Sequence, residues 1–411
     1  MLDIKFIREN PDKVKEGAKS KNIDVPVDEI IALDNEYREL SQSLQELFAK
    51  RNRSAKERDI EGGREVKGEI DSKEGKLKEL KDKLNTLLYS IPNMPASDVK
   101  VGENEGDNDV VKTVGESKKF EFKPKDHVEL GQILDIIDID RAAKVSGARF
   151  AYLKNEGALL EFALVQFAFD LLVKEGFTPI IPPELIKTET MKRLGYMENG
   201  GDEDMFHIEK DELTLVGTAE HSIVPMHMDE TFLVKNLPKR YVGFSTSFRR
   251  EAGSYGKDTK GILRVHQFDK VEMVSFTSEE KDTEEHDYLL SLEEKFFQEL
   301  GIPYQVIKMC SGDLGFPVAR KYDIEAWIPT QDKYREVTSA STTTDFQARR
   351  LNTRYQDGAE KKFAHILNGT AFSTNRPIIA ILENFQEEDG SVVIPEVLRK
   401  YTNFDRISPK K

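Results

Sequence analysis

Apolar residues near the N-terminus recur at alternating spacings of three and four positions, which is the pattern of a coiled-coil seam. Two such seams follow one another, and the segment Glu61-Gly62-Gly63-Arg64 between them indicates a turn. The pattern therefore predicts an antiparallel helical hairpin over about residues 28–91 that projects from the rest of the protein. Each arm would be roughly 45 Å long at about 1.5 Å per residue. The first seam consists of Ile30, Leu33, Tyr37, Leu40, Leu44 and Leu47, and the second of Val66, Ile70, Lys73, Leu77, Leu80, Leu84, Leu87 and Ile91.

The segments on either side of this hairpin suggest how the chain is divided. Asn10 followed by Pro11 is typical of a helix start, so a short helix and then a second one are expected before the hairpin. The sequence IPNMP at residues 91–95 ends the second arm, and residues 96–117, rich in Gly, Asp, Asn and Glu, read as a linker. We therefore predict a helical domain over residues 1–95 and a second domain over residues 118–411.

The second domain alternates strand-like runs with helical stretches. Residues 158–174 predict an apolar helix, and the following GFTPIIPP at 176–183 predicts a helix end and an irregular edge strand. Few strand-helix-strand alternations occur, and neither a Gly-x-Gly-x-x-Gly nor a Walker A sequence is present, so an antiparallel α+β core is favoured over a Rossmann sheet. Other strand-like runs are 241–251, 262–276 and 362–367, and residues 279–300 are helical in pattern.

Composition limits the cellular setting and the chemistry. The 411 residues suggest two or three domains, and the single cysteine, Cys310, rules out an internal disulfide and a multi-cysteine zinc cage. A charged N-terminus argues against a signal peptide, and the most apolar stretch, residues 157–173, contains Glu161, Gln166 and Asp170. We therefore expect a cytoplasmic protein without a membrane span. The net charge of −14 means that any contact with a polyanion requires a local basic patch.

One such patch lies near the expected tip of the hairpin. It contains five basic residues against the single acid Glu57, and this concentration suits binding to a phosphate backbone. A solvated charged face is the alternative for these residues, and a dimerisation or spacer element is the alternative for the hairpin as a whole. The basic residues are Lys50, Arg51, Arg53, Lys56 and Arg58.

A candidate nucleotide site lies in the runs 241–251 and 262–276, which are separated by a glycine-containing loop at 252–261. Side chains alternate between the two faces of a strand, so one face of this hairpin is apolar and the other is polar. Arginines can bind phosphate oxygens, a phenyl ring can stack on a base and a carboxylate can accept from an amine. An ordinary exposed sheet face is the alternative. The apolar face has Val242, Phe244, Phe248, Val265, Val271 and Met273, and the polar face has Arg249, Glu251, Arg264, His266, Phe268, Lys270 and Glu272.

Several segments resemble class II aminoacyl-tRNA synthetases. The sequences FRRE at 248–251 and RVHQF at 264–268, with the loop between them, resemble motif 2, and the run from EAGSYG at 251–256 to HQFDKVEM at 266–273 is similar to the seryl enzymes. GFTPIIPP resembles motif 1, which implies a homodimer, and LNGTAFSTNR at 367–376 with IAILEN at 379–384 resembles motif 3. The heptad hairpin matches the tRNA-binding extension of the seryl family, so the resemblance covers essentially the whole chain.

The resemblance implies a fold and a reaction. It implies an α+β protein with an N-terminal antiparallel coiled-coil arm and a class II catalytic domain, in which helices flank an antiparallel β-sheet. Such an enzyme activates L-serine with ATP to seryl-adenylate and transfers the seryl group to the 3' end of tRNA(Ser). Whether tRNA(Sec) is also charged stays open.

The same resemblance implies the nucleotide site. Arg249 would hold the α-phosphate as a catalytic residue, and Arg376 would be a second catalytic residue at the terminal phosphates. Phe268 would stack on adenine, and Glu336 and Ser339 in REVTSAS would hold Mg²⁺, which prefers oxygen ligands. The full ATP-binding set is Arg249, Arg250, Glu251, Val265, Phe268, Glu336, Val337, Thr338, Ser339 and Arg376.

Serine selection is implied in the same way. Thr218 and Glu220 would surround the α-amino group, while Glu272 and Thr370 would bind the hydroxyl. A pocket that hydrogen-bonds a hydroxyl rejects alanine because its own polar groups would be left unpaired. Threonine would have to be excluded sterically. The serine-binding set is Thr218, Ala219, Glu220, Arg249, Glu272 and Thr370.

Some features depart from the pattern or favour other readings. Asn375 stands before the motif 3 arginine, where the general class II motif has an acid. His221 and His227 are six residues apart without a matching third ligand, so no zinc is expected. The rival functions are a ligase that loads a carrier protein, which would lack the long arm, and a non-catalytic tRNA-binding module, which would lack Arg249, Arg376 or Glu336.

Overall fold

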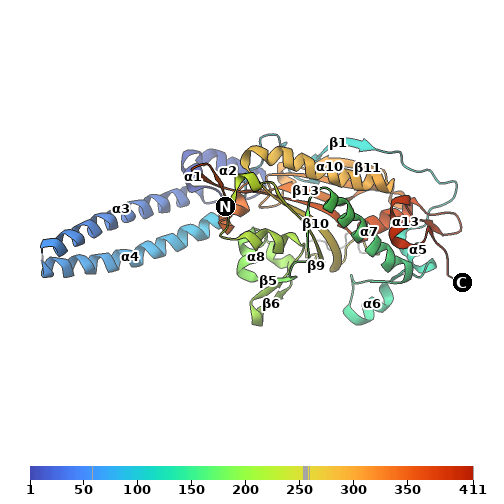
Figure 1. Cartoon of the computed structure of the whole chain (residues 1–411), viewed down its shortest axis with the longest axis horizontal. Helices are drawn as coiled ribbons and strands as arrows, with labels where there is room; N and C mark the ends of the chain where they lie inside the picture. Colours follow the sequence, from blue (N-terminus) through green and yellow to red (C-terminus); the bar gives the residue numbers. More distant parts are fainter. Residues whose placement is uncertain (58, 253–257, 259, 411) are drawn as a thin grey trace. The chain divides into compact units, whose positions relative to one another are not determined.

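The structure is a computed structural model that describes residues 1–57, 59–252, 258 and 260–410. The chain forms two compact units, Met1–Met94 and Pro95–Lys411 (Figure 1). Within its described residues, the first unit contains helices and no strands, and these helices are α1 (Ile4–Glu9), α2 (Pro11–Ser20), α3 (Val27–Glu57) and α4 (Ile60–Tyr89).

Helices α3 and α4 pack side by side along their length as the predicted antiparallel hairpin, which is confirmed (Figure 1). Leu44, Val66 and Ile70 form a buried cluster between them. Lys73 interrupts the apolar seam of α4, and its ammonium donates a hydrogen bond to the hydroxyl of Ser43 on α3 at 2.5 Å. The seam thus tolerates a lysine because that lysine has a polar partner on the facing helix.

The predicted turn at residues 61–64 is wrong, because those residues belong to α4. Asp59 caps this helix, and its carboxylate accepts a hydrogen bond from the backbone N–H of Gly62 at 3.0 Å. A cap of this kind contributes about 1 kcal/mol, which offsets the roughly 1 kcal/mol cost of a glycine in a helix. The end of the α4 seam also differs from the prediction, because Leu88 is buried whereas the predicted seam residue Leu87 is only half-buried.

The second unit is built on an eight-stranded sheet with the order β1-β11-β12-β13-β16-β10-β9-β4. Neighbouring strands are antiparallel except β4, which runs parallel to β9 at one edge. The predicted α+β class with an antiparallel sheet is therefore confirmed. The strands are β1 (Asp109–Val114), β4 (Thr178–Ile180), β9 (Lys239–Phe248), β10 (Gln267–Thr277), β11 (Tyr304–Lys308), β12 (Arg320–Ile328), β13 (Lys333–Thr342) and β16 (His365–Ser373).

Helices α7, α10 and α12 contact this sheet and share its main hydrophobic core. Phe167 of α7, Phe296 of α10 and Ile379 of α12 are buried in that core together with Met273 of β10 and Phe372 of β16. Helix α10 contacts β12, β13 and β16 and lies across the sheet in Figure 1. The helices of this unit are α5 (His127–Ile133), α6 (Ile139–Ser146), α7 (Asn155–Lys174), α8 (Thr188–Leu194), α9 (Glu220–Ile223), α10 (Asp282–Leu300), α11 (Phe346–Leu351), α12 (Asn375–Asn384) and α13 (Glu396–Thr402).

Short strands outside the large sheet form small sheets of two or three strands. One of them joins β5, β6 and β7 and supports the segment that leads into α9. These strands are β2 (Ile137–Asp138), β3 (Tyr152–Leu153), β5 (Leu185–Lys187), β6 (His207–Ile208), β7 (Leu213–Leu215), β8 (Thr231–Leu233), β14 (Arg354–Asp357), β15 (Glu360–Phe363), β17 (Val392–Val393) and β18 (Arg406–Ile407).

Part of the segment expected to be a linker belongs to the sheet. Within residues 96–117, strand β1 pairs with β11 at the sheet edge, with an irregularity between Val110 and Lys112. Five of its six residues are exposed and the last is half-buried. The strand therefore shows none of the alternation that marks a half-buried strand, and its backbone pairing could not be read from side-chain polarity.

The other predicted boundaries are shifted by a few residues. Strand β9 ends at Phe248 rather than 251, and β10 begins at Gln267 rather than 262. Between these ends the chain packs Ile262 and Val265 into the core instead of pairing them in the sheet. Helix α10 begins at Asp282 rather than 279, and the run 362–367 divides between β15 and β16.

Candidate active site

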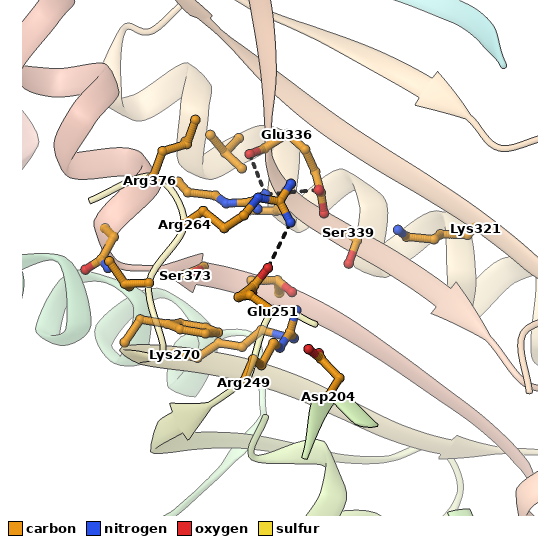
Figure 2. A pocket seen from close by; sticks show the side chains of 17 residues that line it. Asp204, Arg249, Glu251, Arg264, Lys270, Lys321, Glu336, Ser339, Ser373 and Arg376 are labelled. Carbon is orange, nitrogen blue, oxygen red and sulfur yellow. Dashed lines mark hydrogen bonds and ion pairs between the residues drawn. The ribbon is translucent and has the colours of Figure 1, made fainter. Parts of the chain in front are cut away.

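Two adjoining cavities lie on the sheet of the second unit. The first has a volume of about 370 Å³ and is shown in Figure 2. The second has a volume of about 320 Å³. They adjoin because they share the lining residues Asp204, Arg249, Lys270, Lys321 and Ser339.

Arg249 stands at the junction of the two cavities, directly after β9. Its guanidinium lies 5.4 Å from the centre of the Phe268 ring. The same group donates to the backbone carbonyl of Gly217 from Nε at 3.3 Å and from Nη2 at 3.2 Å. Arg249 has no carboxylate partner among the ion pairs of the described residues, so its charge is available to an anion.

A second arginine in the first cavity is held by the loop that follows β9. The Arg264 guanidinium pairs with the Glu251 carboxylate at 2.9 Å and lies 3.8 Å from that of Asp258. Asp258 also pairs with Arg335 of β13. These contacts hold Glu251 and Arg264 at the wall of the cavity (Figure 2). Most of the predicted motif 2 loop, residues 253–257 and 259, lies outside the described residues.

Arg376 occupies the first turn of α12, where the following Pro377 is tolerated because it lies near the helix start. It pairs with the Glu336 carboxylate of β13 at 3.0 Å and donates to the Glu336 carbonyl at 2.7 Å. Burial raises the pKa of Glu336, but the charges of Arg376 and Lys321 outweigh it and lower the pKa to about 2. The Glu336 carboxylate is therefore ionised at neutral pH.

Besides the shared Asp204, the second cavity is lined by two glutamates, Glu220 and Glu272. Glu220, at the start of α9, accepts hydrogen bonds from the Tyr196 hydroxyl at 2.6 Å and from the Gln347 amide at 3.4 Å. Glu272 on β10 pairs with the Lys270 ammonium at 2.5 Å and accepts from the Thr370 hydroxyl at 3.3 Å. Both acids are almost fully buried. Partners of this kind are needed because an unpaired buried carboxylate is costly.

Lys270 links two of the predicted serine ligands. Besides pairing with Glu272, its ammonium donates to the Thr218 hydroxyl at 3.2 Å. Burial raises the pKa of Glu272, and the Lys270 charge opposes that rise. His221 closes the same loop, because its Nδ1 accepts from the backbone N–H of Gly217 at 3.2 Å. Burial, with the charges of Arg249 and Lys270, lowers the pKa of His221 to about 3, so the ring is neutral.

The structure brings together nearly all of the residues predicted for the nucleotide. The exception is Arg250, which is exposed, lies 5.4 Å from the Phe206 ring centre and lines neither cavity. The predicted nucleotide residues that line the first cavity are Arg249, Glu251, Val265, Phe268, Glu336, Val337, Thr338, Ser339 and Arg376.

The residues predicted for serine divide differently. Four of them line the second cavity, namely Thr218, Glu220, Arg249 and Glu272. Thr370 lines the first cavity and reaches the second only through its hydrogen bond to Glu272. Ala219 lines neither cavity, because its side chain packs in a hydrophobic cluster instead.

Sequence reasoning missed several charged or polar groups that line the cavities. Arg264 and Lys270 were predicted on the polar face of the strand hairpin, although neither was given a role of its own. Tyr196 gave no local signal, since it is 24 residues from its partner Glu220. The missed lining residues that carry a charge or a hydroxyl include Tyr196, Asp204, Lys321, Ser341 and Ser373.

Comparisons with known proteins agree with this architecture. Residues 205–385, which carry both cavities' main strands, match the class II tRNA synthetase core domain of the glycine, histidine, proline, serine and threonine enzymes. Residues 1–95 match the seryl-tRNA synthetase N-terminal domain. The second unit is thus a class II aminoacyl-tRNA synthetase core.

Relatives that match along the whole chain identify the family. The serine–tRNA ligase of Pyrococcus horikoshii is 44% identical, covering 100% of this chain and 98% of that protein. That of Dictyoglomus thermophilum is 43% identical, with 100% of both covered. The crystal structure of the P. horikoshii seryl-tRNA synthetase complexed with ATP matches with a TM-score of 0.94 over 100% of both chains. The chain belongs to the seryl-tRNA synthetase family, which places it among the ATP-dependent aminoacyl-tRNA ligases.

A further structural match agrees with this assignment. The cytoplasmic serine–tRNA ligase from Naegleria fowleri in complex with AMP has a TM-score of 0.91 and 33% identity, covering 100% of this chain and 99% of that one. Within the described residues, none of the helices combines the length and the apolar character needed to cross a membrane.

Proposed function

We propose that this chain activates L-serine with ATP and transfers the seryl group from the adenylate to the 3' end of tRNA(Ser). The observation that carries the proposal is the junction of the two cavities. A cavity lined by arginines opens there into a smaller one lined by the buried acids Glu220 and Glu272. Cations suit a triphosphate, and two acids beside a hydroxyl suit a small amino acid with an ammonium and a hydroxyl.

Arg249 has the position that adenylate formation requires. A serine carboxylate oxygen forms a bond to the α-phosphorus, the bond from that phosphorus to the bridging oxygen breaks, and pyrophosphate leaves with the electron pair. Arg249 lines both cavities and is held towards their junction by the Gly217 carbonyl. Its charge would stabilise the negative charge that develops on the α-phosphoryl oxygens.

The rest of the nucleotide has matching groups in the first cavity. Phe268 offers a ring face for adenine, and Arg249 already packs against that ring. Glu251 and the Val265 backbone are the polar groups proposed to bind the adenine edge. Arg376, fixed by Glu336 at the start of α12, is proposed to hold the terminal phosphates.

Mg²⁺ is proposed to accompany ATP and to be held by Glu336 and Ser339. These residues fit a hard cation, since Glu336 is an ionised carboxylate and Ser339 adds a hydroxyl on the same strand. Among the residues that the structure describes, no three His, Cys, Asp or Glu side chains are grouped as a metal site. Phosphate oxygens would therefore complete the ligand set, and the ion would neutralise phosphate charge. No zinc is part of this proposal.

Serine selectivity is assigned to the second cavity. Glu220 and Thr218 would bind the α-ammonium, and Glu272 with Thr370 would bind the hydroxyl. Tyr196 and Gln347 both donate to the Glu220 Oε1 oxygen, so the other carboxylate oxygen is proposed as the acceptor for the ammonium. An alanine would leave Glu272 without a hydroxyl donor, so it would bind poorly.

A homodimer is also proposed, on the basis of motif 1 and of exposed apolar side chains near it. Phe162 of α7 is 66% exposed and Leu159 is 51% exposed, while Ile181 after β4 is 82% exposed. Large apolar side chains gathered on a surface favour association with another protein surface. A second copy of this chain, in the cytoplasm, is the proposed partner.

The helical unit is proposed to bind tRNA(Ser), and charging of tRNA(Sec) is a question for direct assay. Lys50, Arg51, Arg53 and Lys56 are all exposed on α3, so they are accessible to a phosphate backbone. Arg58, the fifth basic residue of the predicted patch, lies outside the described residues.

The variant Glu272→Gln tests the serine site. The amide keeps the size of the side chain but removes the charged acceptor, whose hydrogen bond is worth about 1.5–3 kcal/mol. We therefore expect kcat/KM for serine in pyrophosphate exchange to fall by about tenfold to a hundredfold, with KM for ATP nearly unchanged. Glu175→Gln is the matched control, because Glu175 also pairs with a lysine, Lys295, at 3.0 Å but lines neither cavity. Unchanged kcat/KM for serine in the Glu272 variant would contradict the assignment.

A further inference from the structure

The side chain of Lys321 lies at the junction of the two cavities but has no role in the mechanism above. It is one of three cations that line both cavities, together with Arg249 and Lys270. Lys270 is neutralised locally by Glu272 at 2.5 Å. Lys321 pairs with Asp323 at 3.0 Å, but Asp323 lines neither of these two cavities. Lys321 and Arg249 are therefore the two shared cations that have no ion-pair partner among the acids lining the cavities.

Strand β12 determines where the Lys321 side chain points. Arg320 and Ile324 lie on the face of β12 that is turned away from the cavities. There Arg320 donates a hydrogen bond to His286 of α10 at 3.0 Å, and Ile324 is buried in the core. Lys321 and Asp323 consequently share the face that carries the cavities. Across the β12–β13 pairing, Asp323 is opposite Ser339. Figure 2 shows the Lys321 ammonium directed towards Ser339.

Asp323 holds Lys321 in this orientation. The Lys321 ammonium lies 3.0 Å from Asp323 Oδ1 and donates to Oδ2 at 3.3 Å. The Asp323 side chain is only 5% exposed, whereas that of Lys321 is 23% exposed. The acid is thus anchored in the sheet while the ammonium stays accessible from the cavities. Burial lowers the pKa of Lys321, but the Asp323 and Glu336 carboxylates outweigh it and raise that pKa, so the ammonium stays charged.

We propose that Lys321 is a further catalytic residue, which binds the α-phosphoryl oxygens during adenylate formation, and that Asp323 is its positioning residue. The inference rests on the proposed function. When the carboxylate oxygen of serine bonds to the α-phosphorus and the bond to pyrophosphate breaks, negative charge accumulates at the junction of the cavities. A cation fixed there before the reaction stabilises that charge without reorganising.

The test is single-turnover formation of seryl-adenylate by Lys321→Met, which removes the charge but keeps the length of the side chain. We expect the rate to fall by about a hundredfold, the effect typical of removing one preorganised donor, with the equilibrium Kd for ATP changed by less than about threefold. Lys321→Arg should recover at least about a tenth of the wild-type rate because it restores the charge. Lys308→Met is the matched control, since Lys308 of the neighbouring strand β11 pairs with Asp98 at 2.7 Å and lines neither cavity.

A double variant separates catalysis from structural support. Lys321→Met leaves Asp323 buried without its partner, which could disturb the sheet. In Lys321→Met/Asp323→Asn no unpaired charge remains, so a purely structural defect would be repaired, whereas the catalytic defect would persist. Recovery of the wild-type rate in the double variant, or a single variant within about threefold of wild type, would overturn the proposal. Failure of the wild-type enzyme to form seryl-adenylate would overturn the proposed function itself, a distinct result.

Discussion

Replacing Arg249 with alanine should slow the formation of seryl-adenylate by a hundredfold or more, an effect of about 3 kcal/mol on the transition state. The arginine lines both cavities, and its guanidinium is oriented by the Gly217 carbonyl at 3.2 and 3.3 Å and by the Phe268 ring. It is therefore ready to bind charge that develops between ATP and serine. Removing it takes away a preorganised cation that the remaining groups cannot replace.

Rapid-quench measurement of adenylate formation, with serine affinity measured separately, checks this expectation. Arg354→Ala is the control, because Arg354 also lies over an aromatic ring, at 4.3 Å from the Phe363 centre, but lines neither cavity. We expect the control to form adenylate at the wild-type rate. A near wild-type rate in the Arg249 variant would mean that the motif 2 residues have been assigned wrongly.

Shortening the helical hairpin should abolish aminoacylation while leaving serine-dependent pyrophosphate exchange nearly unchanged. Every residue that lines the two cavities comes from the second unit, at Tyr196 or beyond. Replacing residues 41–75 with a short glycine-rich turn keeps the inner part of α3 and α4, including the Arg8–Asp34 ion pair at 2.5 Å that joins α1 to α3. We expect kcat/KM for tRNA to fall by at least about a hundredfold, since the phosphate contacts that supply most of the affinity are lost.

A finer version of this experiment removes only charge. Substituting glutamine for Lys50, Arg51, Arg53 and Lys56, all exposed, should reduce the slope of log Kd for tRNA against log salt by up to about 3 to 4. The control changes the exposed lysines Lys235, Lys281, Lys361 and Lys400, which carry the same total charge on the second unit. If the shortened enzyme charges tRNA with an unchanged KM, the hairpin is a spacer or an assembly element.

The long repeats of the chain were predictable because their signals are redundant. The α3–α4 hairpin rests on a spacing repeated over many turns, so a single lysine in the seam did not conceal it. The signal for a turn, in contrast, depends on only one or two residues. The turn predicted at Gly62 is wrong because the capping carboxylate of Asp59 makes a glycine acceptable in the first turn of the helix. Strand β1 was missed because an exposed edge strand needs no apolar face.

The site was predictable where its residues are close in sequence and share a strand. Phe268 and Glu272 could be placed on one polar face from alternation alone. The hydrogen-bond partners of Glu220 could not be predicted in this way. Tyr196 and Gln347 are distant from Glu220 in the sequence and contact it only in the folded chain. Arg250 shows the converse, since it is adjacent to Arg249 yet points away from both cavities.

The most direct test of the proposed function is ATP–pyrophosphate exchange with each of the twenty amino acids, without tRNA. Two buried acids and the Thr370 hydroxyl form a small polar pocket beside the cation-lined cavity, so serine should support exchange well above every other amino acid. Alanine should fail for lack of a hydroxyl, at roughly 10⁴-fold or more discrimination for a site built on such a hydrogen bond. Exchange that depends more strongly on another amino acid, or no exchange with serine, would contradict the account.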